Sequence, residues 1–218
     1  MESIDNSFYK IQELQDLFRN GVLEEKSPRR LWLRRQAFLD NLNNYYLYAV
    51  SSVRFFQEAK EMYEKEIFKP TSQKRKMSEE EGDFDYKLCS SAIAFYGHCR
   101  VCIESARLLL EEAIFTSSSD KEVTELQKHR DKYAKWACYI INNRNALTSH
   151  PHETRRMITG TSSGHGSNGQ VTFNTLDLDH LTLNKKKFIL DPTKDLLDLR
   201  CYIEETADLL EKIYSKAV

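Results

Sequence analysis

The sequence predicts an all-α protein, a four-helix up-down bundle with an extra N-terminal helix and a small β-hairpin insert before the last helix. Apolar residues recur at three- and four-residue steps over most of the 218 residues. Only seven Gly and four Pro interrupt these stretches. The apolar fraction of 40% and the charged fraction of 30% exclude collagen-like, low-complexity and wholly disordered classes. We expect one domain, residues 1–218.

The first two predicted helices are separated by an Asn-Gly stop and a Ser-Pro start. The N-terminal helix lies within residues 1–26, and Asn20-Gly21 offers its end. Ser27-Pro28 supplies an N-cap and a proline at the first helical position, and it opens a long amphipathic helix that Pro70 closes. Residues 69–83 follow as a charged connector, because they lack apolar periodicity.

Two further helices and a β insert follow, before the last helix. The third helix runs from about Phe84 to Phe115, and the fourth begins at Asp120 or a neighbouring Ser. It ends close to Ser149, since Pro151 disfavours helical backbone at the residue before it. Residues 155–190 contain short β-type runs around a glycine-rich loop, and Asp191-Pro192 opens the final helix.

Charge and cysteine content limit the compartment and the partners. Lys plus Arg number 32 and Asp plus Glu 33, so the chain has no global basic field and any nucleic-acid site is local. Five cysteines lie within apolar helical stretches, a pattern typical of buried thiols in a reducing compartment. The N-terminus lacks a basic and apolar leader, and no apolar run is long enough to cross a bilayer. We expect a cytoplasmic protein with no membrane partner.

Several short motifs resemble known binding or catalytic motifs but lack the sequence context that those sites require. The glycine-rich run 164–169 precedes a strand and not the helix that a dinucleotide loop needs, and His129-Arg130-Asp131 lacks the order of a kinase. We interpret them as a flexible turn and a solvent-facing helical trio. Cys99 and Cys102 have zinc-knuckle spacing beside His98, but a second Cys pair is missing, so core packing is favoured. No metal or cofactor is expected.

The densest set of polar groups lies at the end of the fourth helix, from Asn142 to His152. RNA cleavage without a metal needs a base for the 2′-hydroxyl proton, an acid for the leaving 5′-oxygen and a cation for the phosphoryl charge. Arg144, His150 and His152 could supply these groups, while Asn145 or Ser149 could orient the scissile phosphate. The alternative is an ordinary polar helix end, where His favours the negative end of the dipole and Pro terminates.

Helix geometry separates the arginine from the first histidine. Six residues at 100° each place Arg144 and His150 about 120° apart around an ideal helix. Either Pro151 unwinds His150 back toward Arg144, or a symmetric dimer brings two helix ends together into a composite site.

Arg144-Asn145, then Ala146-Leu147-Thr148-Ser149, and then His150-Pro151 resemble the Arg-x(4-6)-His motif of the HEPN superfamily (higher eukaryotes and prokaryotes nucleotide-binding), with five residues between the Arg and the His. The four-helix plan with a final helix after a variable insert is similar too. The resemblance implies a homodimeric, metal-independent endoribonuclease that leaves a 2′,3′-cyclic phosphate, with Arg144 and His150 catalytic and Asn145 as the supporting polar residue. HEPN toxins paired with a nucleotidyltransferase antitoxin carry Tyr where this chain has His152.

Basic residues near the motif are candidate RNA contacts. Ser149, His152, Arg155 and Arg156 adjoin it, and Lys185-Lys186-Lys187 lies in the same insert, although charge runs of this kind more often form a solvated loop. A second candidate groove surrounds Trp32, and the alternative for it is snorkelling at a helix start; its cations are Lys26, Arg29, Arg30, Arg34 and Arg35.

The sequence therefore favours a HEPN-type endoribonuclease that acts as a toxin-like or antiviral defence effector, with RNA and an antitoxin or sensor protein as its partners. The alternative is a catalytically inactive HEPN-like module that binds RNA, a nucleotide or a protein, because fold does not imply function.

Overall fold

The computed structural model describes the backbone of residues 6–23, 29–67, 79–117, 119–147, 156–163, 171–177 and 182–215. Side chains are described for residues 6–20, 33–62, 87–88, 90–117, 119–145 and 190–215.

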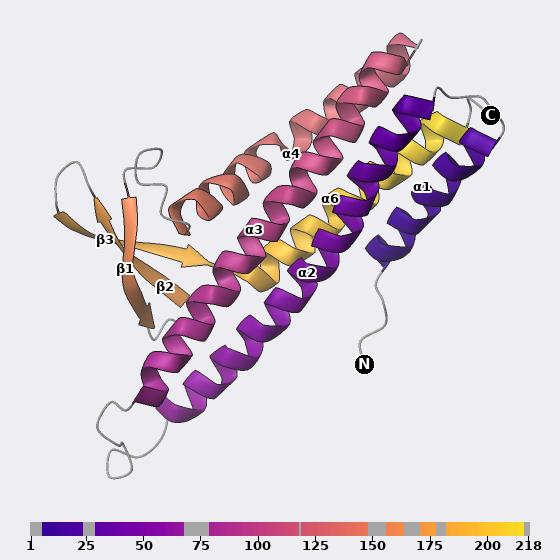
Figure 1. Cartoon of the computed structure of the whole chain (residues 1–218). Coiled ribbons are helices and arrows are strands. Elements are labelled where there is room, and N and C mark those ends of the chain that lie inside the picture. Colours follow the sequence, from indigo (N-terminus) through magenta and orange to yellow (C-terminus); the bar gives the residue numbers. More distant parts are fainter. Residues whose placement is uncertain are drawn as a thin grey trace. The chain divides into compact units, whose positions relative to one another are not determined.

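The fold of the described chain is mainly helical, as predicted (Figure 1). Five helices and three strands follow one another as α1 (Asn6–Leu23), α2 (Arg29–Ile67), α3 (Glu79–Thr116), α4 (Asp120–Leu147), β1 (Arg156–Ser163), β2 (Val171–Asp177), β3 (Thr182–Leu190) and α6 (Pro192–Tyr214). None of the helices, over their described residues, combines the length and apolar character needed to cross a membrane.

The start of α6 agrees with the capping residues that the sequence provides. Asp191 Oδ1 accepts a hydrogen bond from the Lys194 backbone N–H at 3.1 Å, which caps α6 as the Asp-Pro pair predicts. Two boundaries differ from prediction. Helix α1 continues past Asn20-Gly21 to Leu23, and α3 begins at Glu79, inside the predicted connector. Three consecutive glutamates at the start of α3 favour helix there, because negative charge is stabilised at a helix N-terminus.

The chain divides into two compact units. Unit 1 comprises Met1–Tyr48, His98–Tyr139 and Leu197–Val218, and unit 2 comprises Ala49–Gly97 and Ile140–Leu196. Helices α2, α3, α4 and α6 each contribute residues to both units.

The core of unit 1 is built by one apolar face from each of its helical segments. In α1 the buried residues recur at steps of three and four, at Ile11, Leu14 and Phe18, as an amphipathic helix requires. The other segments bury the same kind of face: Leu39, Leu42 and Tyr46; Cys99, Cys102, Ala106, Leu109 and Leu110; Leu126; and Leu199, Tyr202, Ile203 and Leu210.

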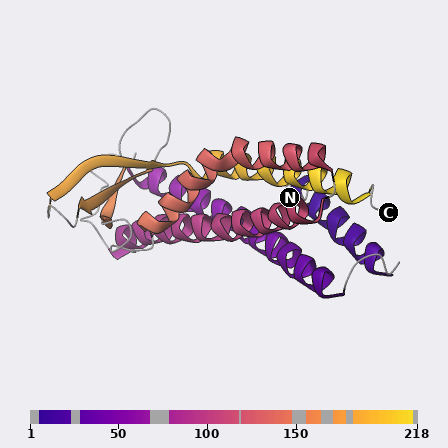
Figure 2. The ribbon, with the colours of Figure 1, turned by 90° about the horizontal axis from the view of Figure 1, so that it is seen from above.

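Unit 2 contains the sheet and the helix halves around it. Tyr96 donates a hydrogen bond from its hydroxyl to Asp195 Oδ2 at 2.5 Å, and both side chains are buried. Gln57 Nε2 donates to Thr193 Oγ1 at 3.2 Å. These two bonds tie α3 and α2 to the first turn of α6. In Figures 1 and 2 strand β3 leads through a single residue, Asp191, into that turn.

The β insert differs from the predicted hairpin, because it is a three-stranded antiparallel sheet with the order β1-β2-β3. Strand β2 is central, and its Phe173 pairs with Thr161 on one side and with Phe188 on the other. The register shifts once in each pairing, between Ile158 and Gly160 and between Phe173 and Thr175. The third strand includes Lys185-Lys186-Lys187, a charge run whose polarity conceals its strand character in the sequence.

Candidate functional site

Helix α4 carries the arginine of the predicted motif in its last turn. Asp120 and Glu122 lie in the first turn and Arg144 in the last, so charges of the favourable sign stand at both ends of the helix dipole. The helix ends at Leu147, close to the predicted end and three residues before His150.

The described part of the motif is Asn143-Arg144-Asn145. Arg144 and Asn145 are half-buried, and Arg144 Nη1 donates a hydrogen bond to Asn145 Oδ1 at 3.0 Å. The two residues predicted to act together are therefore in contact. Asn143 is only 2% exposed, and its Nδ2 has no acceptor among the described residues. A buried donor without an acceptor costs about 1–3 kcal/mol, so the Asn143 amide destabilises this end of α4.

The other predicted site residues cannot be placed beside Arg144. Ser149, His150, His152 and Arg155 lie outside the described residues. Arg156 begins β1, where its backbone pairs opposite Asp177 and its side chain is not described.

The paired cysteines belong to the core of unit 1. Cys99 and Cys102 are fully buried, and the Cys102 thiol donates to the Leu42 carbonyl at 3.8 Å. Burial raises the pKa of Cys102, so its thiol stays protonated at neutral pH and is unsuited to metal ligation. The described side chains include no group of three or more His, Cys, Asp or Glu that could hold a metal ion. The prediction that the cysteines are all buried is wrong, however, because Cys138 and Cys201 are exposed.

The predicted solvent-facing trio on α4 is wrong for its first member. Arg130 and Asp131 are exposed, but His129 is buried. It follows Leu126 by three residues and precedes Tyr133 by four, which puts it on the core-facing side of the helix. That spacing was visible in the sequence and could have predicted the burial.

The His129 imidazole sits in a network of unit 1. The Thr206 hydroxyl donates to the Tyr202 carbonyl at 2.6 Å, so its oxygen accepts from His129 Nε2 at 2.8 Å. Nδ1 then carries the lone pair, 3.7 Å from Glu205 Oε2. Burial lowers the pKa of His129, while the Glu205 carboxylate opposes this shift and Lys132 adds to it. The imidazole is neutral at neutral pH.

This network does not provide a nucleophile, because the Thr206 hydroxyl is 1% exposed and already donates its proton within α6. The His129 ring stacks on Tyr202 with centroids 5.9 Å apart and planes within 2°. Trp136 packs against the same tyrosine at 5.6 Å. The arrangement joins α4 to α6 and serves the core of unit 1.

Arg35, a predicted cation of the second candidate RNA groove, belongs to the core of unit 1. Arg35 is buried, and its Nε donates to Glu112 Oε1 at 2.7 Å. Its guanidinium also lies 4.6 Å from the Tyr214 ring centroid and 5.4 Å from that of Phe18. Arg34 is exposed and lies over Phe38 at 5.5 Å. The remaining predicted members, Lys26, Arg29, Arg30 and Trp32, have no described side chain.

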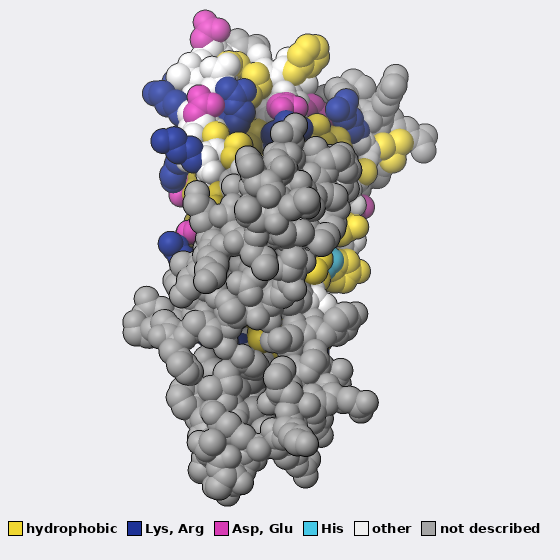
Figure 3. All heavy atoms as spheres, turned by 90° about the vertical axis from the view of Figure 1, so that its left-hand side faces the viewer, with side chains coloured by type: hydrophobic (Ala, Val, Ile, Leu, Met, Phe, Trp, Pro, Cys, Tyr) yellow, Lys and Arg dark blue, Asp and Glu magenta, His cyan; other side chains and the backbone are white. Residues whose placement is uncertain are grey.

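The described part of the face in Figure 3 carries Lys and Arg side chains interspersed with Asp and Glu, gathered toward the top of the view. That mixture matches the net charge of −1 and gives the described part of this face no single-sign field. Comparison of the chain with family models, with curated proteins and with solved structures found no match in any of the three.

Proposed function

We propose that the protein is a metal-independent endoribonuclease of the HEPN type, folded as a four-helix up-down bundle with the N-terminal helix and β insert as additions. In this proposal it acts in the cytoplasm as a homodimer, as a toxin-like or antiviral defence effector. An antitoxin or sensor protein controls it.

The observation that carries the proposal is the Arg144–Asn145 contact in the last turn of α4. A half-buried guanidinium fixed by a neighbouring amide is oriented before substrate arrives, so less entropy is lost on binding a phosphate. The chain then reaches His150-Pro151 within three residues of the helix end, which keeps the imidazole within a short tether of Arg144.

The chemistry assigned to these residues balances without a metal. One imidazole accepts the proton of the 2′-hydroxyl, whose oxygen attacks the adjacent phosphorus. The bond to the 5′-oxygen breaks, and that oxygen takes a proton from a second imidazolium. Arg144 bonds the phosphoryl oxygens, on which negative charge grows in the transition state. The products are a 2′,3′-cyclic phosphate and a 5′-hydroxyl.

Each composite site then contains two imidazoles, His152 and the His150 that the partner protomer supplies. A two-fold axis brings the ends of two α4 helices together, so that His150 of one protomer serves the site of the other. This arrangement also removes the 120° separation of Arg144 and His150 within one ideal helix.

The primary test is RNA cleavage by the purified protein in excess EDTA. End-labelled total RNA is incubated with wild type, Arg144→Ala and His150→Ala, with Arg130→Ala as control, because Arg130 is an exposed arginine of the same helix. We expect cyclic-phosphate ends from wild type and the control, and a loss of about 10²–10⁴-fold in rate in the two motif variants. No cleavage by a folded wild-type dimer, or equal cleavage by all four proteins, refutes the ribonuclease and favours the binding module.

Mixing the two inactive variants tests the composite site. If Arg144 and His150 act across the dimer, a heterodimer of Arg144→Ala and His150→Ala contains one intact site. Random exchange then restores about a quarter of wild-type activity, from half the dimers with one of two sites. No restoration after complete exchange places both residues in one protomer.

A further inference from the structure

Three exposed lysines form one row on the unit 1 part of helix α4, at Lys121, Lys128 and Lys135. Successive members are seven residues apart, which is close to two helical turns, so all three lie on one side of the helix. At a rise of 1.5 Å per residue, the row is about 21 Å long and has one lysine about every 10.5 Å.

The lysine row has no carboxylate partner among the described side chains. Two acidic residues of α4 lie three or four positions from its members, and both pair with other cations. Glu125 Oε2 lies 2.8 Å from Lys212 Nζ, and Asp131 Oδ1 lies 3.1 Å from Arg130 Nη2. The row therefore keeps three positive charges that the neighbouring carboxylates do not compensate.

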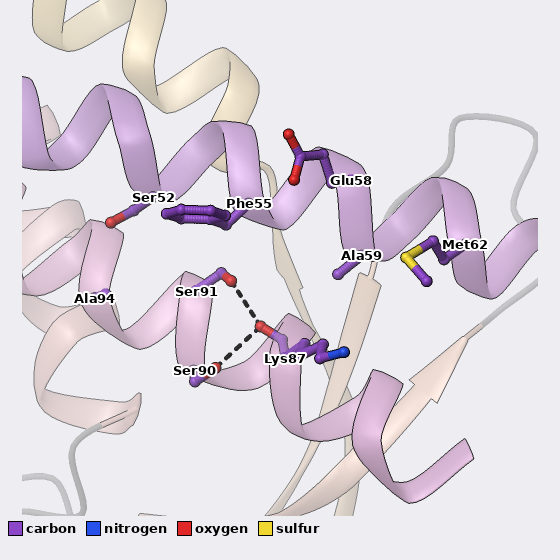
Figure 4. Close-up of a pocket in the computed structure, with 9 residues that line it drawn as sticks. All are labelled: Ser52, Phe55, Glu58, Ala59, Met62, Lys87, Ser90, Ser91 and Ala94. Atoms are coloured by element: carbon purple, nitrogen blue, oxygen red, sulfur yellow. Dashed lines mark hydrogen bonds between the residues drawn. The ribbon is translucent and has the colours of Figure 1, made fainter. Parts of the chain in front are cut away.

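Other described surfaces of the chain combine both signs of charge. Arg54 pairs with Glu58 at 3.2 Å, and Arg107 pairs with Glu111 at 3.7 Å. In unit 2 the groove between α2 and α3 carries Glu58 on one wall and Lys87 on the other (Figure 4). A line of one sign differs from these surfaces, and it occurs in a chain whose net charge is only −1.

Exposed apolar side chains lie at the end of the lysine row. Tyr139 follows Lys135 by four residues, one turn along the same side of α4, and it is 40% exposed. The Lys132–Glu205 pair, at 2.6 Å, joins α4 to the antiparallel α6. Seven residues further along each helix, Tyr139 comes within one residue of the level of Leu197, which is 54% exposed.

The charge spacing of the row fits an α-helix and not a nucleic acid. Duplex DNA carries one negative charge per 1.7 Å of its axis, so 21 Å would bring about twelve charges to three lysines. Glu125 and Asp131, beside the row, would repel them further. A helix with one acidic residue in every seven brings one carboxylate per 10.5 Å or about one for each lysine.

We propose that the lysine row binds an acidic amphipathic helix of a partner protein. This helix lies along α4, with one carboxylate at each lysine and an apolar side chain on Tyr139 and Leu197. Exposed ion pairs are individually weak, so the apolar end contributes most of the affinity and the lysines set the register of the partner. The inference concerns a protein partner and does not depend on the ribonuclease reaction.

A designed helical peptide tests the proposal by fluorescence anisotropy with the full chain. The labelled, side-chain-stapled alanine peptide of about 23 residues has Glu at three seven-residue steps and Leu one turn beyond each terminal Glu, so it fits in either direction. A comparison peptide of the same composition has its Glu residues five positions apart, on different sides of the helix. We expect the comparison peptide to bind about tenfold more weakly, because its charge is equal but its spacing is wrong.

Substitutions in the row test the register. Each of Lys121→Gln, Lys128→Gln and Lys135→Gln should raise the peptide Kd by about threefold, and the triple variant by about thirtyfold. Lys194→Gln, at an exposed lysine of unit 2, is the control and leaves the Kd unchanged.

A truncation tests the apolar end separately. Tyr139→Ala should raise the Kd by about tenfold, whereas Tyr9→Ala, at a tyrosine of α1 that is 55% exposed, should not change it. Absence of peptide binding, equal binding of the two peptides, or a triple variant within about twofold of wild type overturns the proposal. An RNA duplex of about twenty base pairs is titrated in parallel. If it binds more tightly than the peptide and loses affinity in the triple variant, the row belongs to a nucleic-acid surface and the proposal is likewise overturned.

Discussion

Replacing Arg35 distinguishes a core arginine from an RNA-binding one. Its side chain and that of Glu112 are each 8% exposed, and Nε and Oε1 are 2.7 Å apart. The second carboxylate oxygen, Glu112 Oε2, is buried and has no hydrogen-bond partner among the side chains that the structure describes. The Arg35→Leu variant therefore leaves a buried carboxylate with no cation.

The magnitude follows from this burial. Removing one partner of a buried ion pair costs about 3–5 kcal/mol, because the remaining charge is uncompensated. Loss of the guanidinium contacts with Tyr214 and Phe18 adds about 1 kcal/mol. We expect Arg35→Leu to lower the free energy of unfolding by about 5 kcal/mol. The double variant Arg35→Leu/Glu112→Leu removes both charges and recovers most of this loss.

Urea denaturation followed by circular dichroism measures both variants. Arg19→Leu is the control, because Arg19 makes an exposed pair with Asp16, and we expect a change within about 0.5 kcal/mol. A loss below about 1 kcal/mol in Arg35→Leu, or a double variant no more stable than the single one, refutes the structural role. If stability is unchanged and RNA binding weakens, Arg35 belongs to a nucleic-acid surface.

Two further predictions concern buried polar groups. Burial holds the folded-state pKa of His129 below its unfolded value of 6.5. The neutral His129 therefore contributes its full stability above pH 6.5, and this contribution is lost as the pH falls below that value. The urea midpoint should decrease from pH 7 to pH 5, less steeply in His129→Gln, and equal slopes in the two proteins would contradict the assignment. Tyr96→Phe removes the donor to the buried Asp195 carboxylate and should cost about 1.5–3 kcal/mol in urea denaturation. Tyr9→Phe, at a residue 55% exposed, should stay within about 0.5 kcal/mol, and a similar small effect at Tyr96 would show that its bond adds nothing.

The helical part of the fold could be predicted because its signals are local. Asp191-Pro192 specifies a cap through one side chain and one backbone N–H, and steps of three and four identify the buried face of α1. The sheet was harder to predict, because the charge run Lys185-Lys186-Lys187 gives β3 no alternating pattern. Strand number depends on pairing across sequence, which local periodicity does not report.

In the candidate site, contacts between sequence neighbours could be predicted, but contacts between distant residues could not. Arg144 and Asn145 are neighbours in sequence, so their contact needs little tertiary information. Arg35 looked like part of a basic groove because its partner Glu112 lies 77 residues away. The spacing of His129 from Leu126 and Tyr133 could have predicted its burial, but its acceptor Thr206 lies on another helix, 77 residues away, and could not be predicted. Long-range pairing decides whether a charged or polar side chain is structural, and it cannot be identified from the side chain alone.

The division of α2, α3, α4 and α6 between the two units has a consequence for how the protein can be divided or shortened. Each unit consists of separate chain segments, and the boundaries fall inside continuous helices. No single cut in the backbone releases either unit intact, because every boundary interrupts helical hydrogen bonds and leaves unsatisfied groups at a new helix end. Neither unit could therefore have been inherited or transplanted as one contiguous stretch of sequence, and a truncation designed to isolate one of them must remove part of the other.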